Sequence, residues 1–150
     1  SRVQPSRFFR AGVGAVIANE RGEVLACERR DISGAWQFPQ GGLKDGEAPI
    51  EAVRREVLEE TGITADHLRL MSECPDLLVY ELPPTSWSHK TGRGQVQRWF
   101  LFEYRGQLAI ALPPESEFAD CAWRPFEEVE RHTPEFRRPV YKRLRECFHL

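Results

Sequence analysis

Apolar and polar residues follow one another in short runs that predict strands, with one longer segment of helical spacing. The apolar runs at 11–18 and 23–28 are separated by the turn sequence Asn19-Glu20-Arg21-Gly22, which predicts a β-hairpin. Shorter runs with apolar or aromatic residues predict further strands at 36–38, 77–82, 96–104 and 121–124. Segments rich in proline, glycine or polar residues predict loops at 31–35, 83–94 and 112–119, of which 83–94 should be mobile.

Helical spacing is clearest at residues 48–61. Three apolar residues there recur at i, i+3 and i+7, which places them on one buried face: Ile50, Val53 and Val57. Pro49 suits the first helical turn, where its missing N–H would be unpaired anyway. Gly62 can adopt the left-handed conformation that ends a helix, and the apolar residue that follows it can pack back. The segment therefore predicts a complete amphipathic helix.

Further helical segments near the C-terminus complete the predicted architecture. A helical turn is expected at 126–131 and a last helix at 139–147, with inward-facing Val140, Leu144 and Cys147. Strands on either side of a central helix, with another helix at the end, predict an α/β sandwich. A chain of 150 residues is long enough for one hydrophobic core, so we expect a single domain over residues 1–150.

Composition, charge and cysteine usage narrow the class of protein. An apolar fraction of 41% and a charged fraction of 29% are ordinary for a soluble domain, and the net charge of −2 provides no overall basic field for nucleic acid. The four cysteines form no C-x-x-C pair, so we expect reduced thiols in a cytoplasmic protein rather than a zinc site or disulfide framework. The longest apolar run near the N-terminus, 13–18, is too short for a signal peptide or membrane span.

Three glutamates gather near the end of the predicted central helix. Glu56 lies one helical turn from both Glu59 and Glu60, so their carboxylates crowd one another. The C-terminal end of a helix also disfavours negative charge because of the helix dipole. A solvated acidic face is the ordinary explanation of such a cluster. A divalent cation with oxygen ligands, Mg²⁺ or alternatively Mn²⁺, would instead remove the conflict.

The glutamates belong to a longer pattern with fixed spacing. Residues 41–63 read GGLKDGEAPIEAVRREVLEETGI and fit G-x5-E-x7-R-E-U-x-E-E-x-G-U at every position, where U is a bulky aliphatic residue. This segment resembles the signature of the Nudix hydrolases, which implies an α/β/α sandwich with a mixed central sheet. The implied metal ligands are Glu56, Glu59, Glu60 and the carbonyl oxygen of Gly41. The remaining motif positions are Gly42, Glu47, Arg55 and Gly62. We expect Glu47 and Arg55 to form an ion pair between the loop and the helix.

Segments outside the motif narrow the resemblance to one branch of the family. Trp36-Gln37-Phe38-Pro39-Gln40-Gly41-Gly42 is similar to the branch of diadenosine tetraphosphate hydrolases and bacterial RNA 5′-pyrophosphohydrolases. Residues 9–14, 94–100 and 136–141 are similar to the same branch. Two departures concern the substrate side: Ser116 stands before Glu117 where the branch usually has proline, and the loop at 83–94 is short.

The branch resemblance implies roles for residues that lie far apart in the sequence. Glu117 is the implied general base or additional metal ligand, carried by a loop that can move as substrate binds. Arginines bind phosphate through a planar fork, and those at implied phosphate positions are Arg10, Arg29 and Arg137. Tyr80 and Phe136 match positions that sandwich a base, and Gln95 matches a polar position of the site. The alternative explanation for the arginines is an ordinary surface charge, and the alternative for Tyr80 and Phe136 is packing in the core.

The implied activity is hydrolysis of a phosphoanhydride bond in a nucleoside-linked polyphosphate. Two substrates fit the residues: a dinucleoside polyphosphate such as diadenosine tetraphosphate, and the 5′-triphosphate end of RNA. Asp31-Ile32 and Pro83-Pro84 favour the dinucleotide. A nucleotide-sugar or ADP-ribose hydrolase is an alternative, as is a catalytically silent domain that only binds nucleotides. The complete set of glutamates argues against the silent domain. The expected partner is the nucleotide or RNA 5′-end substrate, no membrane association is expected, and the sequence leaves protein partners open.

Overall fold

The computed structural model describes residues 8–150. Its three helices are α1 (Pro49–Thr61), α2 (Phe126–His132) and α3 (Arg138–Phe148). Short 3-10 turns lie at η1 (Ala65–His67), η2 (Pro84–Ser86) and η3 (Glu135–Arg137). The strands are β1 (Phe9–Ala18), β2 (Val24–Arg29), β3 (Trp36–Gln37), β4 (Gln40–Gly42), β5 (Leu68–Glu73), β6 (Leu78–Glu81), β7 (Gly94–Tyr104) and β8 (Phe118–Arg124).

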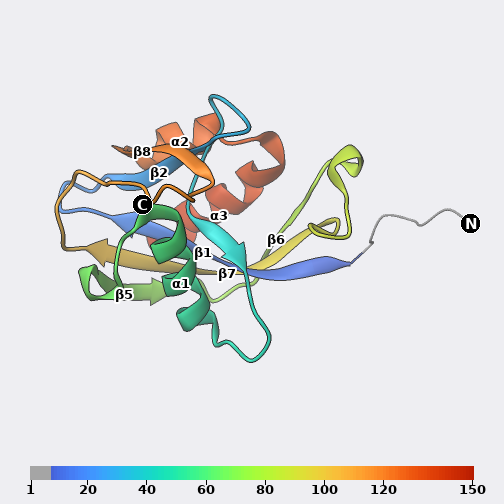
Figure 1. The fold of residues 1–150 in the computed structure, drawn as a ribbon, viewed down its shortest axis with the longest axis horizontal. Helices are drawn as coiled ribbons and strands as arrows, with labels where there is room; N and C mark the ends of the chain where they lie inside the picture. The colour runs from blue at the N-terminus through green and yellow to red at the C-terminus, as the bar shows by residue number, and fades with distance from the viewer. Residues whose placement is uncertain (1–7) are drawn as a thin grey trace, which may run out of the picture.

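Strand β1 is the central element of one mixed sheet. It pairs in parallel with β7 from Phe9↔Gly94 to Ala18↔Glu103, and on its other edge it pairs antiparallel with β4 and β2. Both β5 and β6 pair with β7, whereas β3 and β8 pair with β2. The mixture of parallel and antiparallel ladders confirms the mixed central sheet (Figure 1).

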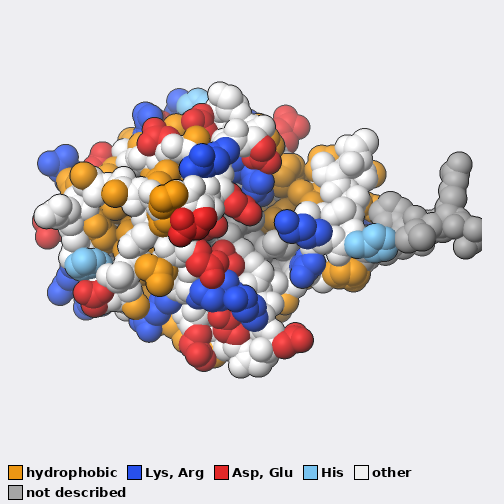
Figure 2. All heavy atoms as spheres, in the orientation of Figure 1, with side chains coloured by type: hydrophobic (Ala, Val, Ile, Leu, Met, Phe, Trp, Pro, Cys, Tyr) orange, Lys and Arg blue, Asp and Glu red, His pale blue; other side chains and the backbone are white. Residues whose placement is uncertain are grey.

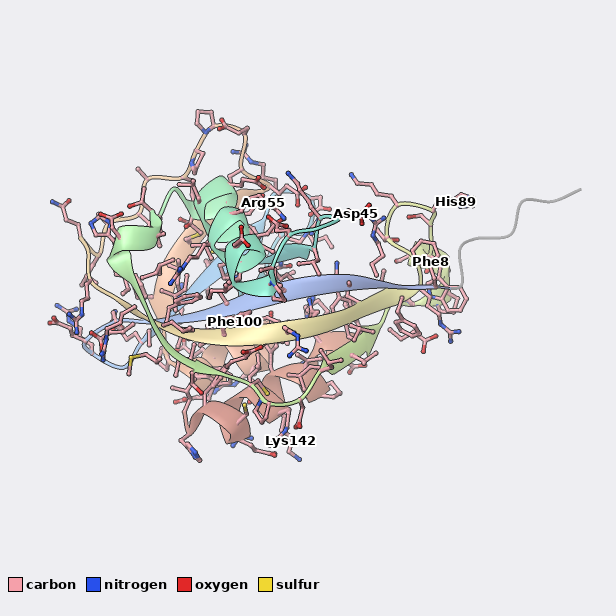
Figure 3. All side chains as sticks on the ribbon, turned by 90° about the horizontal axis from the view of Figure 1, so that it is seen from below. Phe8, Asp45, Arg55, His89, Phe100 and Lys142 are labelled. Atoms are coloured by element: carbon pink, nitrogen blue, oxygen red, sulfur yellow. The ribbon has the colours of Figure 1, made fainter. Side chains whose placement is uncertain are left out.

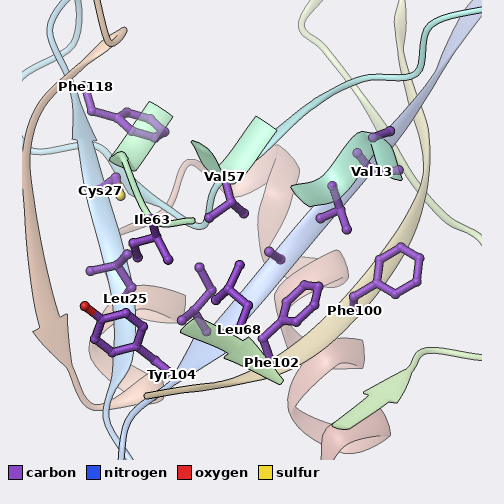
Figure 4. Close-up of a cluster of buried hydrophobic side chains, with 14 residues drawn as sticks. Val13, Leu25, Cys27, Val57, Ile63, Leu68, Phe100, Phe102, Tyr104 and Phe118 are labelled. Atoms are coloured by element: carbon purple, nitrogen blue, oxygen red, sulfur yellow. The ribbon is translucent and has the colours of Figure 1, made fainter. Parts of the chain in front are cut away.

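The helices cover both faces of the sheet, which makes the fold an α/β/α sandwich. Helix α1 lies on one side of β1 and β7, and α3 lies on the other side (Figure 3). Alternating side chains of β1 serve the two faces, because Val13, Ala15 and Ile17 pack with α1 whereas Val16 packs with α2 and α3. Figure 4 shows the core on the α1 side, where Val57 and Ile63 meet Phe102 and Tyr104.

Helix α1 ends as its sequence predicts. Gly62 has a φ of +78° in the left-handed region, and its N–H donates to the carbonyl of Leu58 at 2.9 Å. Pro49 occupies the first turn. The end of α1 is therefore fixed by backbone geometry next to the glutamates.

The other elements agree with the sequence pattern less closely. The strand expected at 121–124 begins earlier, at Phe118, so the loop expected at 112–119 is shorter. The segment 83–94 contains η2 and a bridge between Ser88 and Gly92, so it is partly structured. Strand β5 is not predicted, because its apolar alternation is limited to Leu68 and Leu70 and every residue after Leu68 is exposed. Within residues 8–150 no helix is long and apolar enough to cross a membrane.

Candidate active site

Helix α1 places Glu56 directly against strand β4. A Cβ atom added to Gly41 would lie 2.0 Å from the carboxyl carbon of Glu56, a distance that no real side chain tolerates. Gly41 itself pairs with Val13 of the central strand. Glycine at position 41 therefore allows a half-buried carboxylate to lie on the backbone of the strand that enters the motif.

Arg55 connects the glutamates of the motif to the loop before α1. Its Nε and Nη2 donate to the two carboxylate oxygens of Glu47 at 2.7 and 2.9 Å, which is a two-point ion pair. The same guanidinium donates to Glu56 at 2.9 Å and to the carbonyl of Gly42 at 2.9 Å. Hydrogen bonding to Arg55 lowers the pKa of Glu47 to about 2. The expected ion pair is present, and Arg55 also orients Glu56.

The loop that carries Glu117 is bound to the end of α1. The backbone N–H of Glu117 donates to Oε2 of Glu60 at 3.2 Å, and the hydroxyl of Ser116 donates to the carbonyl of Glu60 at 2.7 Å. Arg30, the residue after β2, holds the loop, because its backbone N–H donates to the carbonyl of Glu117 and its Nε donates to that of Ser116. Ser116, the departure from the family pattern, thus joins the loop to the helix.

Burial and mutual repulsion act against charge on two of these carboxylates. Burial is the main cause that raises the pKa of Glu56, and Glu59 and Glu60 add to the increase. Burial also raises the pKa of Glu60, together with the charge of Glu117. Two carboxylates with raised pKa values and a nearby backbone carbonyl are an all-oxygen donor set that suits a hard divalent cation.

The carboxylates of this donor set do not converge on one point. Among residues 8–150, no cluster of three or more His, Cys, Asp or Glu side chains is close enough to bind a metal ion. The side chain of Glu59 is 49% exposed and lies 3.4 Å from Arg55. Cation binding by Glu56, Glu59, Glu60 and Glu117 together therefore requires rotation of these side chains. Figure 2 shows acidic side chains gathered at the centre of this face, beside a basic group near α1.

The three arginines at implied phosphate positions have different surroundings. Arg29 is paired with Asp31 at 2.8 Å. This pairing raises the pKa of Arg29, and the nearby charge of Glu117 adds to the increase. Arg10 is exposed on β1 and donates to the carbonyl of Lys90 in the segment 83–94. Arg137 is buried and donates to the side chain of Gln37 at 3.0 Å, so phosphate contact requires that it exchange this partner.

The structure brings Tyr80 and Phe136 together without space for a base between them. Their ring centroids are 5.6 Å apart, and the guanidinium of Arg137 lies 5.3 and 5.0 Å from the two rings. Tyr80 is buried, whereas Phe136 borders an open groove lined by Glu81, Leu82, Pro83, Pro84 and Glu135. A base between the rings would require them to separate, whereas the groove side of Phe136 is already open.

Sequence reasoning missed several polar residues that support the site. Gln40 and the fully buried Gln97 join Gln95 and Tyr80 by side-chain hydrogen bonds. Arg30 and Ser116 hold the Glu117 loop. The available signal was a glutamine inside a strand of apolar and aromatic residues, since a buried polar side chain needs a partner.

The fold and the motif together define one class of protein. Residues 8–144 match the NUDIX domain, so the chain belongs to the Nudix hydrolase family. It is 38% identical over 143 residues to the RNA pyrophosphohydrolase of Cereibacter sphaeroides, with 91% of this chain and 88% of that protein covered. It is 32% identical over 160 residues to Nudix hydrolase 26, chloroplastic, of Arabidopsis thaliana, with 99% and 73% covered.

The fold is also similar to that of a solved enzyme complex. The Ap4A hydrolase of C. elegans in a binary complex superposes with a TM-score of 0.72 at 19% identity, covering 93% of this chain and 98% of that one. At this identity the similarity concerns the fold alone. It confirms the Nudix α/β/α sandwich that the motif implies.

Proposed function

We propose that this protein is a divalent-metal-dependent pyrophosphohydrolase that cleaves a phosphoanhydride bond in a nucleoside-linked polyphosphate. The observation that carries the proposal is the position of Glu56 against Gly41, with Glu60 and the Glu117 backbone joined at the same end of α1. The raised pKa values of Glu56 and Glu60 support cation binding, because a bound cation offsets the unfavourable charge. Mg²⁺ is the proposed ion, and Mn²⁺ has compatible ligand chemistry.

Each residue of the site has a proposed role in the reaction. Glu56, Glu59, Glu60 and the Gly41 carbonyl would hold the cation, which neutralises phosphate charge and lowers the pKa of a water when it is bound. Glu117 accepts a proton from the attacking water or adds a cation ligand. Its backbone is already fixed to Glu60 and Arg30, so only the side chain has to move. Arg29 and Arg10 supply positive charge for the phosphates.

We propose the 5′-triphosphate end of RNA as the substrate. Relatives at 36–38% identity are named RNA pyrophosphohydrolases, and they match over most of their length. Arg10, Lys90 and Arg93 lie where β1 meets the segment 83–94, and Arg93 is paired with Glu81, so a single strand leaving the site would meet positive charge from Arg10 and Lys90 there. Such an enzyme would work in the cytoplasm, where the four free cysteines remain reduced.

A dinucleoside polyphosphate is the second candidate substrate. Its support is the plant-like sequence Asp31-Ile32 together with Pro83-Pro84, and the plant relative that covers 99% of this chain. In this case the basic side chains around 83–94 would face the second nucleoside rather than an RNA chain.

Turnover with Mg²⁺ on a short 5′-triphosphorylated RNA and on diadenosine tetraphosphate, under matched conditions, tests the choice. We expect kcat/KM to favour the RNA at least about 100-fold, equivalent to about 2.7 kcal/mol of transition-state binding. The opposite preference would establish the second candidate. Activity on neither, but on ADP-ribose or a nucleotide sugar, would contradict both substrates.

A Glu60→Gln variant tests the metal assignment in the same assay. We expect the fold to stay intact, turnover to fall by at least about 100-fold, and the thermal stabilisation by Mg²⁺ to decrease. Glu115→Gln is the matched control, because Glu115 is an exposed residue of the same loop. Turnover within a factor of two of the wild type for Glu60→Gln would contradict a role in catalysis.

A further inference from the structure

A chain of buried and half-buried polar side chains runs across the strands of the sheet beside the site. Gln97 of β7 is completely buried, and its side-chain oxygen accepts a hydrogen bond from the indole N–H of Trp99 at 3.0 Å. The nitrogen of the same carboxamide donates to the side-chain oxygens of Gln40 at 3.2 Å and of Gln95 at 3.0 Å. The side-chain nitrogen of Gln40 in turn donates to the hydroxyl of Tyr80 at 3.1 Å.

The indole of Trp99 determines which atoms of this network donate and which accept. An indole N–H can only donate, so it faces the oxygen of Gln97 and never the nitrogen. The nitrogen of Gln97 must then face acceptors, which fixes the oxygens of Gln40 and Gln95 toward it. The alternative flip of any one of these carboxamides would place two donors or two acceptors against each other in a buried site. The orientation of every carboxamide therefore follows from one donor.

Both ends of the network are left as donors. The nitrogen of Gln95 carries hydrogens on the side away from Gln97, and the hydroxyl of Tyr80 keeps its own proton because it accepts from Gln40. Gln95 is only half-buried. A donor that faces the site can bind acceptor atoms, such as phosphate oxygens, but repels another donor.

The Gln95 end lies next to the backbone of the active site. A Cβ atom added to Gly12 would lie 2.4 Å from the side-chain oxygen of Gln95 and 3.0 Å from the carbonyl oxygen of Gly41. Glycine at position 12 therefore leaves space for the Gln95 carboxamide next to the strand that carries Gly41. The carboxamide of Gln95 is consequently close to the Gly41 carbonyl, which is one of the proposed cation ligands.

We propose that Trp99, Gln97 and Gln40 are positioning residues that hold Gln95 and Tyr80 as hydrogen-bond donors to a nucleotide, with Gln95 facing a phosphate oxygen. The inference rests on the proposed function for its substrate class. Trp99 acts at a distance, because it is completely buried and reaches the substrate only through Gln97. A fixed carboxamide presents its nitrogen without loss of side-chain freedom on binding, whereas a free one would also present its oxygen to the anion.

The Trp99→Phe variant removes the indole N–H and keeps an aromatic ring in place. We expect KM for the nucleotide substrate to rise about 10-fold while kcat stays within a factor of two, because the donors bind ground state and transition state alike. Trp123→Phe is the matched control: its indole N–H donates to the carbonyl of Leu108 at 2.8 Å, away from the network. An unchanged KM for Trp99→Phe would overturn the proposal.

A mutant cycle separates positioning from a general loss of stability. In a background of Gln95→Leu and Tyr80→Phe the network has no donor to orient, so adding Trp99→Phe should leave KM unchanged. A further rise in KM of about 10-fold in that background would mean that Trp99 acts by another route, and would overturn the proposal.

The ligand-free protein provides a readout that does not depend on the proposed function. We expect the side-chain amide protons of Gln40 and Gln97 to exchange slowly with solvent by NMR. Trp99→Phe should broaden the amide signals of Gln40 and Gln95 whereas Trp123→Phe should not. Unaltered glutamine signals in Trp99→Phe would overturn the network. If no nucleotide is hydrolysed by the wild type, the proposed function fails, and these spectra still decide whether Trp99 orients the carboxamides.

Discussion

At the scale of single residues, the site depends on two glycines without side chains as much as on its charged groups. Gly41 and Gly12 leave space that the carboxylate of Glu56 and the carboxamide of Gln95 occupy. Arg55 then fixes Glu56 through a guanidinium that also binds Glu47 and the carbonyl of Gly42. A side chain at either glycine would displace a functional group rather than disturb the hydrophobic core.

Gly41→Ala should reduce kcat at least about 100-fold, because its methyl group would occupy the position of the Glu56 carboxylate. Glu56 is a flexible side chain that can move aside, so we expect the melting temperature to change by only a few degrees. Gly42→Ala is the control, since nothing lies within 4 Å of a Cβ there. Steady-state kinetics and thermal unfolding of both variants check this, and equal activities would contradict the displacement of Glu56.

At the scale of elements, the loop before α1 is joined to the helix by the ion pair between Glu47 and Arg55. Both side chains are largely shielded from solvent, with 15% and 20% of their surface exposed. Arg55 lowers the pKa of Glu47 to about 2 from an ordinary value of 4.5. The folded protein therefore holds this proton less tightly than the unfolded chain does, and the pair stabilises the fold only while Glu47 is ionised.

Glu47→Gln should lower the free energy of unfolding at pH 7, and its difference from the wild type should shrink as pH falls from 4.5 to 2. The stabilisation is complete above the pKa of the unfolded chain and is lost as the folded carboxyl becomes protonated. Urea unfolding at several pH values measures this. Glu20→Gln, at an exposed turn residue, should show no such pH-dependent difference. A difference that grows toward low pH would contradict the assignment.

The sequence predicted those elements whose signals are local. Helix α1 agrees with the expected 48–61 within one residue, because its apolar spacing and its terminal glycine lie in one continuous segment. Glu56, Glu59 and Glu60 belong to the same segment, so their proximity could be predicted as well, whereas Glu117 was assigned only through the family resemblance. Strand β5 could not be predicted, because it is exposed and receives its hydrogen bonds from β7.

The network around Gln97 could not be predicted from the sequence either. Its partners come from β4, β6 and β7, and Gln40 is separated from Gln97 by 57 positions. Tyr80 and Phe136 illustrate the opposite difficulty: the family resemblance pairs them, but only the structure shows that the rings pack together and that the Arg137 guanidinium lies over both. Spacing along the chain reports neighbours on one element, whereas contacts between elements depend on strand order.

At the scale of the whole molecule, the C-terminal helix supports the strand that leads into the site. The hydroxyl of Tyr141 on α3 accepts a hydrogen bond from the backbone N–H of Phe38 at 2.9 Å, and both residues are completely buried. Burial raises the pKa of Tyr141 to about 12. Phe38 lies between β3 and β4, so a contact from the last helix fixes the path of the chain toward Gly41.

Tyr141→Phe should destabilise the protein by about 1–3 kcal/mol, because the buried N–H of Phe38 loses its acceptor. Tyr104→Phe is the comparison: its hydroxyl donates to the carbonyl of Gln107, an exposed residue that water can reach, so the loss should be smaller. Chemical denaturation of both variants measures the difference. A larger loss for Tyr104→Phe would contradict the importance of the buried contact.

The long parallel ladder between β1 and β7 has a further consequence. It runs from Phe9↔Gly94 to Ala18↔Glu103 without a bulge, and it joins the Gly41 side, through β4, to the Tyr80 side, through β6. A slip of one residue would shift the two sides by about 3.3 Å and turn every side chain to the other face. Under the proposed function, strand register therefore sets the distance between the Gly41 carbonyl, a proposed cation ligand, and Tyr80, a proposed nucleotide contact, and with it the phosphorus atom that is attacked.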